Sequence, residues 1–142
     1  HVAHDCVVGD NCILANAVQI GGVSVVEDYA TIGGLTSIHQ KCRVGQHSMT
    51  GGGFKIAQDV PPFILTGGYP LRFAGLNKIG LRRRGFSDED IMILKNAYSY
   101  LYSKSMNVTQ AREKIQNEFG ENKYVQAMLE FVSKSKRGIV GK

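Results

Sequence analysis

The chain has 142 residues, of which 43% are apolar, and carries a formal net charge of +5 at neutral pH. Its aliphatic runs are only a few residues long, so we expect neither a membrane span nor a signal peptide, and hence a soluble protein. The three cysteines are an odd number without C-x-x-C spacing, which argues against a disulfide framework or a zinc knot and favours a reducing cytoplasm. The basic charge favours an anionic partner, but nucleic acid is the weaker candidate because no recognition motif and no tryptophan is present.

Aliphatic side chains recur at every sixth residue through the first sixty residues. Nine of the ten positions in this series are aliphatic: Val2, Val8, Leu14, Ile20, Val26, Ile32, Ile38, Val44, Thr50 and Ile56. A second series, four residues further on, is mostly small, and Gly or Ala commonly follows the aliphatic residue. A helix has a period of about 3.6 and a plain strand a period of about two, so neither explains this pattern. Hexapeptide repeats predict a parallel β-helix in which three repeats close one coil of about 18 residues.

We therefore expect residues 1–60 to form roughly three stacked coils, separated by about 4.8 Å and stabilised by their neighbours. Cys6, Cys12 and Cys42 belong to the small-residue series, and we interpret them as corner packing rather than reactive thiols. Val2 already belongs to the series of aliphatic residues spaced six apart. We therefore expect these coils to be the C-terminal part of a longer prism.

Three of the four histidines are predicted to meet along one edge of this prism. With 18 residues per coil, His4, Gly22 and Gln40 stack, and the columns beside them contain His1 and His39. One interpretation is a metal site, another is a set of solvated turn histidines. We favour a site for a polar substrate and proton transfer, because histidine is the side chain that titrates near neutral pH, and the bare Gly22 N–H could hold an oxyanion. His47 falls in another column, beside Tyr29, and is expected at the surface.

Beyond Val60 the period of six fails. Pro61-Pro62 removes two N–H donors in succession, so the coil is expected to end there, with residues 61–86 as a Gly-rich connector. Residues 87–142 are expected to form a helical domain. Ser87 and the acidic residues after it predict the first helix start, and the Asn107-Val108-Thr109 sequon is interpreted as another.

The second and third helices are expected at about 109–118 and 121–136, the second closed by Gly120. We interpret the apolar stripes of the helices as packing surfaces rather than a cofactor site. Their members are Ile91, Leu94, Ala97, Tyr98, Leu101 and Tyr102, then Val125, Met128, Leu129 and Val132.

Five segments resemble the family of UDP-N-acetylglucosamine acyltransferases that begin lipid A synthesis. They read H-V-A-H-D-C, V-G-D-N-C-I-L-A-N, I-G-G-L-T-S-I-H-Q, A-Q-D-V-P-P and G-L-x-R-R-G-F. The resemblance covers essentially the whole chain, while roughly the first half of the family's chain is missing. It implies a cytoplasmic homotrimer of left-handed parallel β-helices with a C-terminal helical domain. The implied activity moves an (R)-3-hydroxyacyl group from acyl carrier protein to the 3-hydroxyl of UDP-N-acetylglucosamine, without a metal or redox cofactor.

The resemblance also implies roles for individual residues. His4 matches the general base, Asp5 the carboxylate that orients it, and Gly22 the backbone donor to the thioester oxyanion. The positions that match substrate contacts are His1, His39, Gln40, Asn77 and Arg83, the last two acting across the trimer. Gly52 matches the position that limits acyl-chain depth, although the run Gly51-Gly52-Gly53 also reads as a tight turn.

A basic set is the natural dock for an acidic carrier protein and a diphosphate, with solvated surface charge as the alternative. Besides Arg83 it comprises Lys55, Arg72, Arg82 and Arg84. One departure from the family is Val23, where a histidine is common.

Two other functions remain open at this stage: the related hexapeptide N-acyltransferase of the same pathway, and a non-catalytic trimeric scaffold. The A-Q-D-V-P-P and R-R-G-F segments and the three-helix tail weigh against the N-acyltransferase. We expect the isolated 142 residues to be inactive, because half of the site would be absent.

Overall fold

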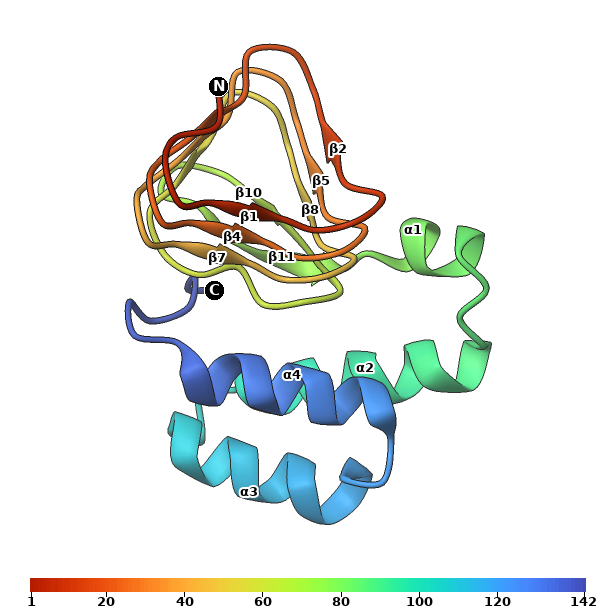
Figure 1. Ribbon diagram of the computed structural model, residues 1–142. Coiled ribbons are helices and arrows are strands. Elements are labelled where there is room, and N and C mark those ends of the chain that lie inside the picture. The colour runs from red at the N-terminus through yellow and green to blue at the C-terminus, as the bar shows by residue number, and fades with distance from the viewer. The chain divides into compact units, whose positions relative to one another are not determined.

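The computed structural model describes all residues from 1 to 142 (Figure 1). The chain divides into two compact units. A prism unit comprises His1–Asn77 together with Ser135–Lys142, and a helical unit comprises Lys78–Lys134. These bounds differ from the expected divisions after residues 60 and 86. The coil continues beyond its expected end, and the C-terminal segment returns to the prism unit.

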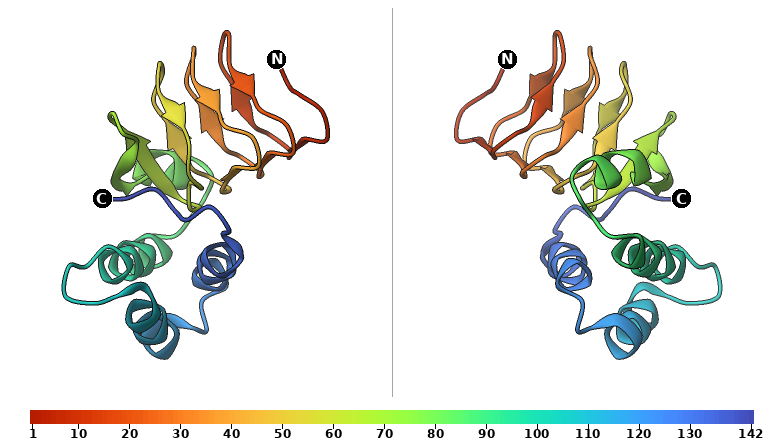
Figure 2. Two further views of the ribbon diagram at one scale, coloured as in Figure 1. Left: turned by 90° about the vertical axis from the view of Figure 1, so that its left-hand side faces the viewer. Right: turned by 90° about the vertical axis from the view of Figure 1, so that its right-hand side faces the viewer.

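Nine two-residue strands form the stacked coils of the prism unit (Figure 2). They are β1 (Val7–Val8), β2 (Ile13–Leu14), β3 (Gln19–Ile20), β4 (Val25–Val26), β5 (Thr31–Ile32), β6 (Ser37–Ile38), β7 (Arg43–Val44), β8 (Met49–Thr50) and β9 (Lys55–Ile56). Strands β1 to β6 each pair in parallel with the strand three further along the chain, giving the ladders β1-β4-β7, β2-β5-β8 and β3-β6-β9. Val8 lies opposite Val26, and Ile20 opposite Ile38. The period of six and the 18-residue coil are thus confirmed.

The turns of the prism are as regular as its strands. One residue in each turn has a positive φ, and these residues are again six apart, from Asp5 at 55° to His47 at 56°. From Val23 onward their N–H groups donate to the preceding coil, as Val23 does to the carbonyl of His4 at 3.0 Å. Val23 has a φ of 60°, which is costly for a β-branched residue and persists only where neighbouring coils fix the backbone.

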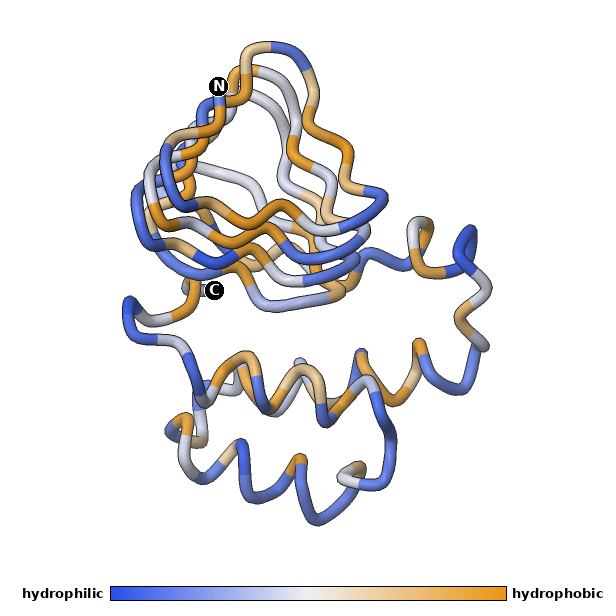
Figure 3. Tube along the Cα trace, in the orientation of Figure 1, coloured by the Kyte–Doolittle hydropathy of each residue, from blue (hydrophilic) through white to orange (hydrophobic).

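Aliphatic side chains fill the interior of the prism. Apolar segments recur at corresponding places in successive coils (Figure 3). Val26, Ile32 and Val44 are fully buried, whereas Val8 in the first coil is 38% exposed, since a coil covers it on one side only. The three cysteines are unpaired; Cys42 is buried, whereas Cys6 and Cys12 are half-buried. Burial raises the pKa of the Cys42 thiol to about 11, so this thiol is protonated at neutral pH.

The sequence predicts that the coil ends at Pro61-Pro62, but in the structure it continues. Strand β10 (Ile64–Gly67) continues it by pairing in parallel with β8, and β11 (Arg72–Leu76) then pairs antiparallel with β10. The prolines are tolerated because they occupy a turn: Gly45 donates its N–H to the carbonyl of Val60, and the chain re-enters the ladder at Phe63. Two missing donors therefore cost no strand pairing.

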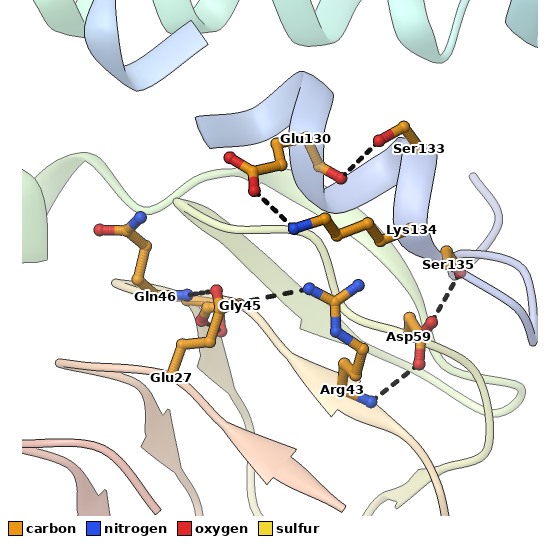
Figure 4. Close-up of polar contacts among 10 residues, drawn as sticks. Glu27, Arg43, Gly45, Gln46, Asp59, Glu130, Ser133, Lys134 and Ser135 are labelled. Atoms are coloured by element: carbon orange, nitrogen blue, oxygen red, sulfur yellow. Dashed lines mark hydrogen bonds and ion pairs between the residues drawn. The ribbon is translucent and has the colours of Figure 1, made fainter. Parts of the chain in front are cut away.

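The C-terminal segment returns to the prism unit and pairs with its last coil. Ile139 bridges to Asp59, and Gly141 to Arg72, while Val140 is buried. The carboxylate of Asp59 is 1% exposed and accepts two hydrogen bonds, from the Arg43 N–H at 2.8 Å and the Ser135 hydroxyl at 2.6 Å (Figure 4). Asp59 therefore ties three separate parts of the chain together.

We expect Asp59→Ala to lower the free energy of unfolding by about 2–3 kcal/mol, because it leaves a buried N–H and a hydroxyl without their charged acceptor. Urea unfolding of the purified protein measures this change. Asp10→Ala is the control, since that carboxylate is exposed and accepts no hydrogen bond from another residue, and should stay within about 0.5 kcal/mol of the wild type. An equal effect of the two substitutions would contradict the role given to Asp59.

The helical unit contains α1 (Lys78–Arg83), α2 (Asp88–Leu101), α3 (Val108–Phe119) and α4 (Lys123–Lys134). Ser87 caps α2 by accepting from the Asp90 N–H, and Asn107 caps α3 in a capping box with Gln110. Both helix starts and the third helix are confirmed, whereas α1 lies in the segment interpreted as a connector. The apolar stripes of α2 and α4 are buried as packing surfaces. None of the helices is long and apolar enough to cross a membrane.

Candidate active site

The stacked coils bring five residues of three successive coils onto one edge, here called the histidine edge. Its members are His1, His4, Gly22, His39 and Gln40. The bridge from Val2 to Ile20 and the pairing of Ile20 with Ile38 place them in three successive coils. The predicted convergence along one edge is therefore confirmed, while the chemical roles of these residues stay predictions.

His4 and Asp5 form the most clearly organised pair on this edge. Nδ1 of His4 lies 3.1 Å from Oδ2 of Asp5, and the two side chains are 77% and 81% exposed. With Nδ1–H donating to the carboxylate, Nε2 of the neutral ring keeps its lone pair and can accept a proton. The Asp5 backbone is at a φ of 55°, the left-handed turn conformation that aspartate tolerates well.

The His4 ring lies against the backbone of Gly22 in the next coil. A β-carbon added at Gly22 would be 2.7 Å from Nε2 and 2.9 Å from Cε1 of His4. Only glycine leaves room for the imidazole in this position. Nε2 is thus held next to a backbone segment that has no side chain.

Backbone N–H groups on the histidine edge are left free, in contrast to those on the next corner. There, Asp28 accepts from the Asp10 N–H at 2.7 Å, and Glu27 accepts from the Gln46 N–H at 3.0 Å (Figure 4). The N–H groups of Gly22 and Gln40 occupy the same turn position and have no acceptor in the chain. The histidine edge therefore offers free donors beside an available base.

His39 is held by a contact to its own turn. Its Nδ1 lies 3.0 Å from the carbonyl oxygen of Gln40, and as the donor in that bond it leaves Nε2 free as an acceptor in the neutral ring. No group of three or more His, Cys, Asp or Glu side chains is placed to hold a metal ion.

Two small polar side chains behind the edge were treated from the sequence as packing only. The Cys6 thiol donates to the carbonyl of Gly21 at 3.1 Å, and the Ser24 hydroxyl donates to the carbonyl of His39 at 3.1 Å. Sequence reasoning could have found them, because each lies in the small-residue series immediately behind a turn of the histidine edge.

Asn77 lies at a different corner of the prism unit from the histidine edge. It is 4% exposed, and its Nδ2 donates to the carbonyl of His47 at 2.9 Å. The expectation that His47 is a surface residue is wrong: it is 8% exposed, and its ring stacks between Tyr29 at 4.7 Å and Phe63 at 5.9 Å. The three rings of this stack come from two coils and from the last turn, so the burial of His47 cannot be predicted from the residues next to it in the sequence.

The remaining predicted residues are spread over both units. Gly52 stacks on Gly34, whose carbonyl oxygen would be 3.0 Å from a β-carbon at position 52, so the tight-turn interpretation has support. Lys55 lines a pocket of about 220 Å³ in the prism unit, together with Ala57, Gln58, Tyr69, Pro70, Leu71 and Val140. Arg72 lies in β11 of the same unit.

The predicted arginines of the helical unit lie at and just after the end of α1. Arg82 and Arg83 are exposed in the last turn of α1, where Arg82 approaches Asp88 at 3.7 Å, and Arg84 follows directly.

Comparison with known proteins identifies the family. Residues 59–140 match the family model described as UDP N-acetylglucosamine O-acyltransferase, domain 2. The chain belongs to the UDP-N-acetylglucosamine O-acyltransferase family. Among curated members, it is 44% identical over 140 residues to the acyl-[acyl-carrier-protein]–UDP-N-acetylglucosamine O-acyltransferase of Thiobacillus denitrificans and 46% identical over 140 residues to that of Aliarcobacter butzleri.

These alignments cover 99% and 98% of this chain but 54% and 53% of the two relatives, so the chain spans about half the length of these O-acyltransferases. Solved structures of the family agree with the fold. The UDP-N-acetylglucosamine acyltransferase LpxA of Bacteroides fragilis superposes with a TM-score of 0.96 at 38% identity, covering 99% of this chain and 55% of that one. The enzyme of Francisella novicida gives 0.95 at 32% identity, covering 100% and 52%.

Proposed function

We propose that the protein containing this chain transfers an (R)-3-hydroxyacyl group from acyl carrier protein to the 3-hydroxyl of UDP-N-acetylglucosamine, the first step of lipid A synthesis. The observation that carries the proposal is the arrangement of His4. Its ring is hydrogen-bonded to Asp5 through Nδ1 and presents Nε2 next to the backbone of Gly22, whose N–H has no acceptor in the chain. Family membership supplies the acyl donor and the sugar nucleotide, as the names of the curated relatives state them.

In the proposed reaction the sugar hydroxyl attacks the thioester carbonyl while Nε2 of His4 takes its proton, since a neutral hydroxyl is a poor nucleophile. Asp5 holds the ring in the required tautomer and stabilises the imidazolium. The negative charge that forms on the carbonyl oxygen is stabilised by the Gly22 N–H. Collapse of this intermediate breaks the carbon–sulfur bond, and the departing sulfur recovers the proton from His4. The chemistry requires no metal or redox cofactor.

The other predicted residues are assigned to binding. His1, His39 and Gln40 flank His4 and Gly22 on the histidine edge and would contact the substrates. Asn77 lies at another corner of the same prism, so a second copy of the chain would be needed to bring it to this edge, in keeping with a homotrimer.

Arg83, with Lys55, Arg72, Arg82 and Arg84, would bind the diphosphate and the acidic carrier. Gly52 would limit acyl-chain depth, and we propose a cytoplasmic location, where the acyl donor is made.

The proposal is tested with the complete protein that contains these residues, incubated with 3-hydroxyacyl carrier protein and either of two acceptors. UDP-N-acetylglucosamine should be acylated on oxygen, and the product identified by mass spectrometry and by its lability to alkali. A UDP-linked 3-O-acylglucosamine with a free 2-amine is the acceptor expected for the N-acyltransferase. Transfer to that amine alone, or to neither acceptor, would refute the proposed function.

A further inference from the structure

The oxyanion donor assigned to Gly22 is one half of a peptide group, and its other half is hydrogen-bonded inside the prism. The N–H of Gly22 and the carbonyl of Gly21 belong to the same planar peptide, so fixing the carbonyl oxygen fixes the direction of the N–H. Sγ of Cys6 lies 3.1 Å from the Gly21 oxygen and 3.6 Å from the His4 oxygen. One thiol therefore contacts both the turn that carries the proposed base and the peptide that carries the proposed oxyanion donor.

Cys6 is the only hydrogen-bond donor to the Gly21 carbonyl within the chain. The equivalent contact at the neighbouring corner is different in this respect. There Cys12 donates to the Glu27 carbonyl at the same distance of 3.1 Å, but that oxygen also accepts the N–H of Ala30 at 3.3 Å. The 21–22 peptide thus depends on its thiol, whereas the 27–28 peptide has a second anchor.

A related arrangement recurs one coil further on. The Ser24 hydroxyl stacks over Cys6 and donates to the carbonyl of His39, whose peptide carries the free N–H of Gln40; this oxygen also accepts the N–H of Cys42 at 3.2 Å. A donor at the carbonyl also polarises the peptide, which strengthens its N–H as a donor on the opposite side. Small polar residues, a half-buried Cys6 and a buried Ser24, thus lie behind both free N–H groups of the histidine edge.

From this geometry we infer that Cys6 is a positioning residue for the oxyanion-binding peptide of the site. The inference rests on the proposed function. The thiol does not touch substrate and is not a nucleophile; it acts through the Gly21–Gly22 peptide by holding its plane and polarising it. Because this N–H binds the transition state more strongly than the ground state, removing the thiol should lower kcat while leaving KM for the sugar nucleotide unchanged.

The experiment compares three substitutions in the complete protein that contains these residues: Cys6→Ala, Cys6→Ser and Cys12→Ala. Cys6→Ala removes the donor, and Cys6→Ser retains one with a hydroxyl of similar size. Cys12→Ala is the matched control, because it removes a thiol with the same carbonyl contact at the neighbouring corner, away from His4 and Gly22. Thermal unfolding of all three reports any common loss of packing.

We expect Cys6→Ala to lower kcat about 3- to 10-fold, the range given by one modest hydrogen bond, with KM unchanged. Cys6→Ser should recover most of this loss, and Cys12→Ala should match the wild type. Equal kcat values for the two alanine variants, or a loss in Cys6→Ser as large as in Cys6→Ala, would overturn the inference. A wild-type protein without acyl transfer would instead overturn the proposed function, and the inference with it.

Discussion

Replacing His4 by alanine is expected to reduce kcat for acyl transfer by about 10²–10⁴-fold, the range for loss of a positioned general base. The structure places Nε2 of His4 against the backbone of Gly22, where a β-carbon would lie 2.7 Å from it. His39 also has a free Nε2, but its Nδ1 is bound to the Gln40 carbonyl rather than to a carboxylate. It therefore lacks the partner that would stabilise an imidazolium.

The fold should be unaffected, because the His4 side chain is 77% exposed and contributes little to the core. Asn16→Ala is the control: Asn16 occupies the same turn position at another corner and is exposed. Steady-state kinetics of the complete protein that contains these residues, with acyl carrier protein thioester and UDP-N-acetylglucosamine, and circular dichroism measure both expectations. If His4→Ala keeps wild-type turnover, the base must be another residue and the proposed mechanism fails.

Asp5→Asn separates orientation from charge in the same pair. An amide at this position can still accept from Nδ1–H but cannot stabilise the imidazolium. We expect a loss of kcat that is smaller than that of His4→Ala, measured in the same assay. A loss in Asp5→Asn that exceeds that of His4→Ala would show that Asp5 acts directly on substrate rather than through the ring.

The repeat made the prism, its coil length and the histidine edge predictable from the sequence, because these depend on one period. Each coil repeats the same strand-and-turn units, so a regular spacing of aliphatic residues determines which residues, distant in the sequence, stack on one another. Helix starts were predictable for a similar reason: Ser87 and Asn107 satisfy N–H groups of their own helix, and the contact is local.

Features that join distant parts of the chain were missed. Pro61 and Pro62 signal a strand end locally, but the parallel pairing of β10 with β8 continues the coil around them. Ile139 pairs with Asp59, 80 positions away, and the sequence of neither segment predicts this pairing. His47 is buried by rings from two other turns, so its environment could not be read from its own hexapeptide.

The corners of the prism differ in the side chains that lie beside their turn N–H groups, and this difference distinguishes the histidine edge. All corners present N–H groups at the same turn position, so free donors alone are a property of the fold. At the next corner Asp28 and Glu27 cover two of these groups with carboxylates, and a negative charge there would repel an oxyanion. On the histidine edge the neighbouring residues are small or neutral, so the backbone N–H donors remain free, and a base lies next to them.

Gly22→Ala is expected to lower kcat about 10²-fold while leaving the free energy of unfolding nearly unchanged. The added β-carbon would come within 2.7 Å of Nε2 of His4, so the ring must turn away from the Gly22 N–H, and a displacement of about 1 Å is enough for such a loss. The backbone of Gly22 does not have a positive φ, so alanine adds no strain, and the N–H itself is retained.

The substitution therefore tests the placement of the base rather than the presence of the donor. Gly34→Ala is the matched control, because it lies at the same turn position on another corner, where a β-carbon would meet the Asn16 carbonyl oxygen at 3.2 Å and no histidine. Kinetics and thermal unfolding of both variants distinguish a displaced ring from a disturbed coil. An active Gly22→Ala variant would mean that the His4 ring does not work from its position over Gly22. An equal loss in Gly34→Ala would assign the effect to the coil instead.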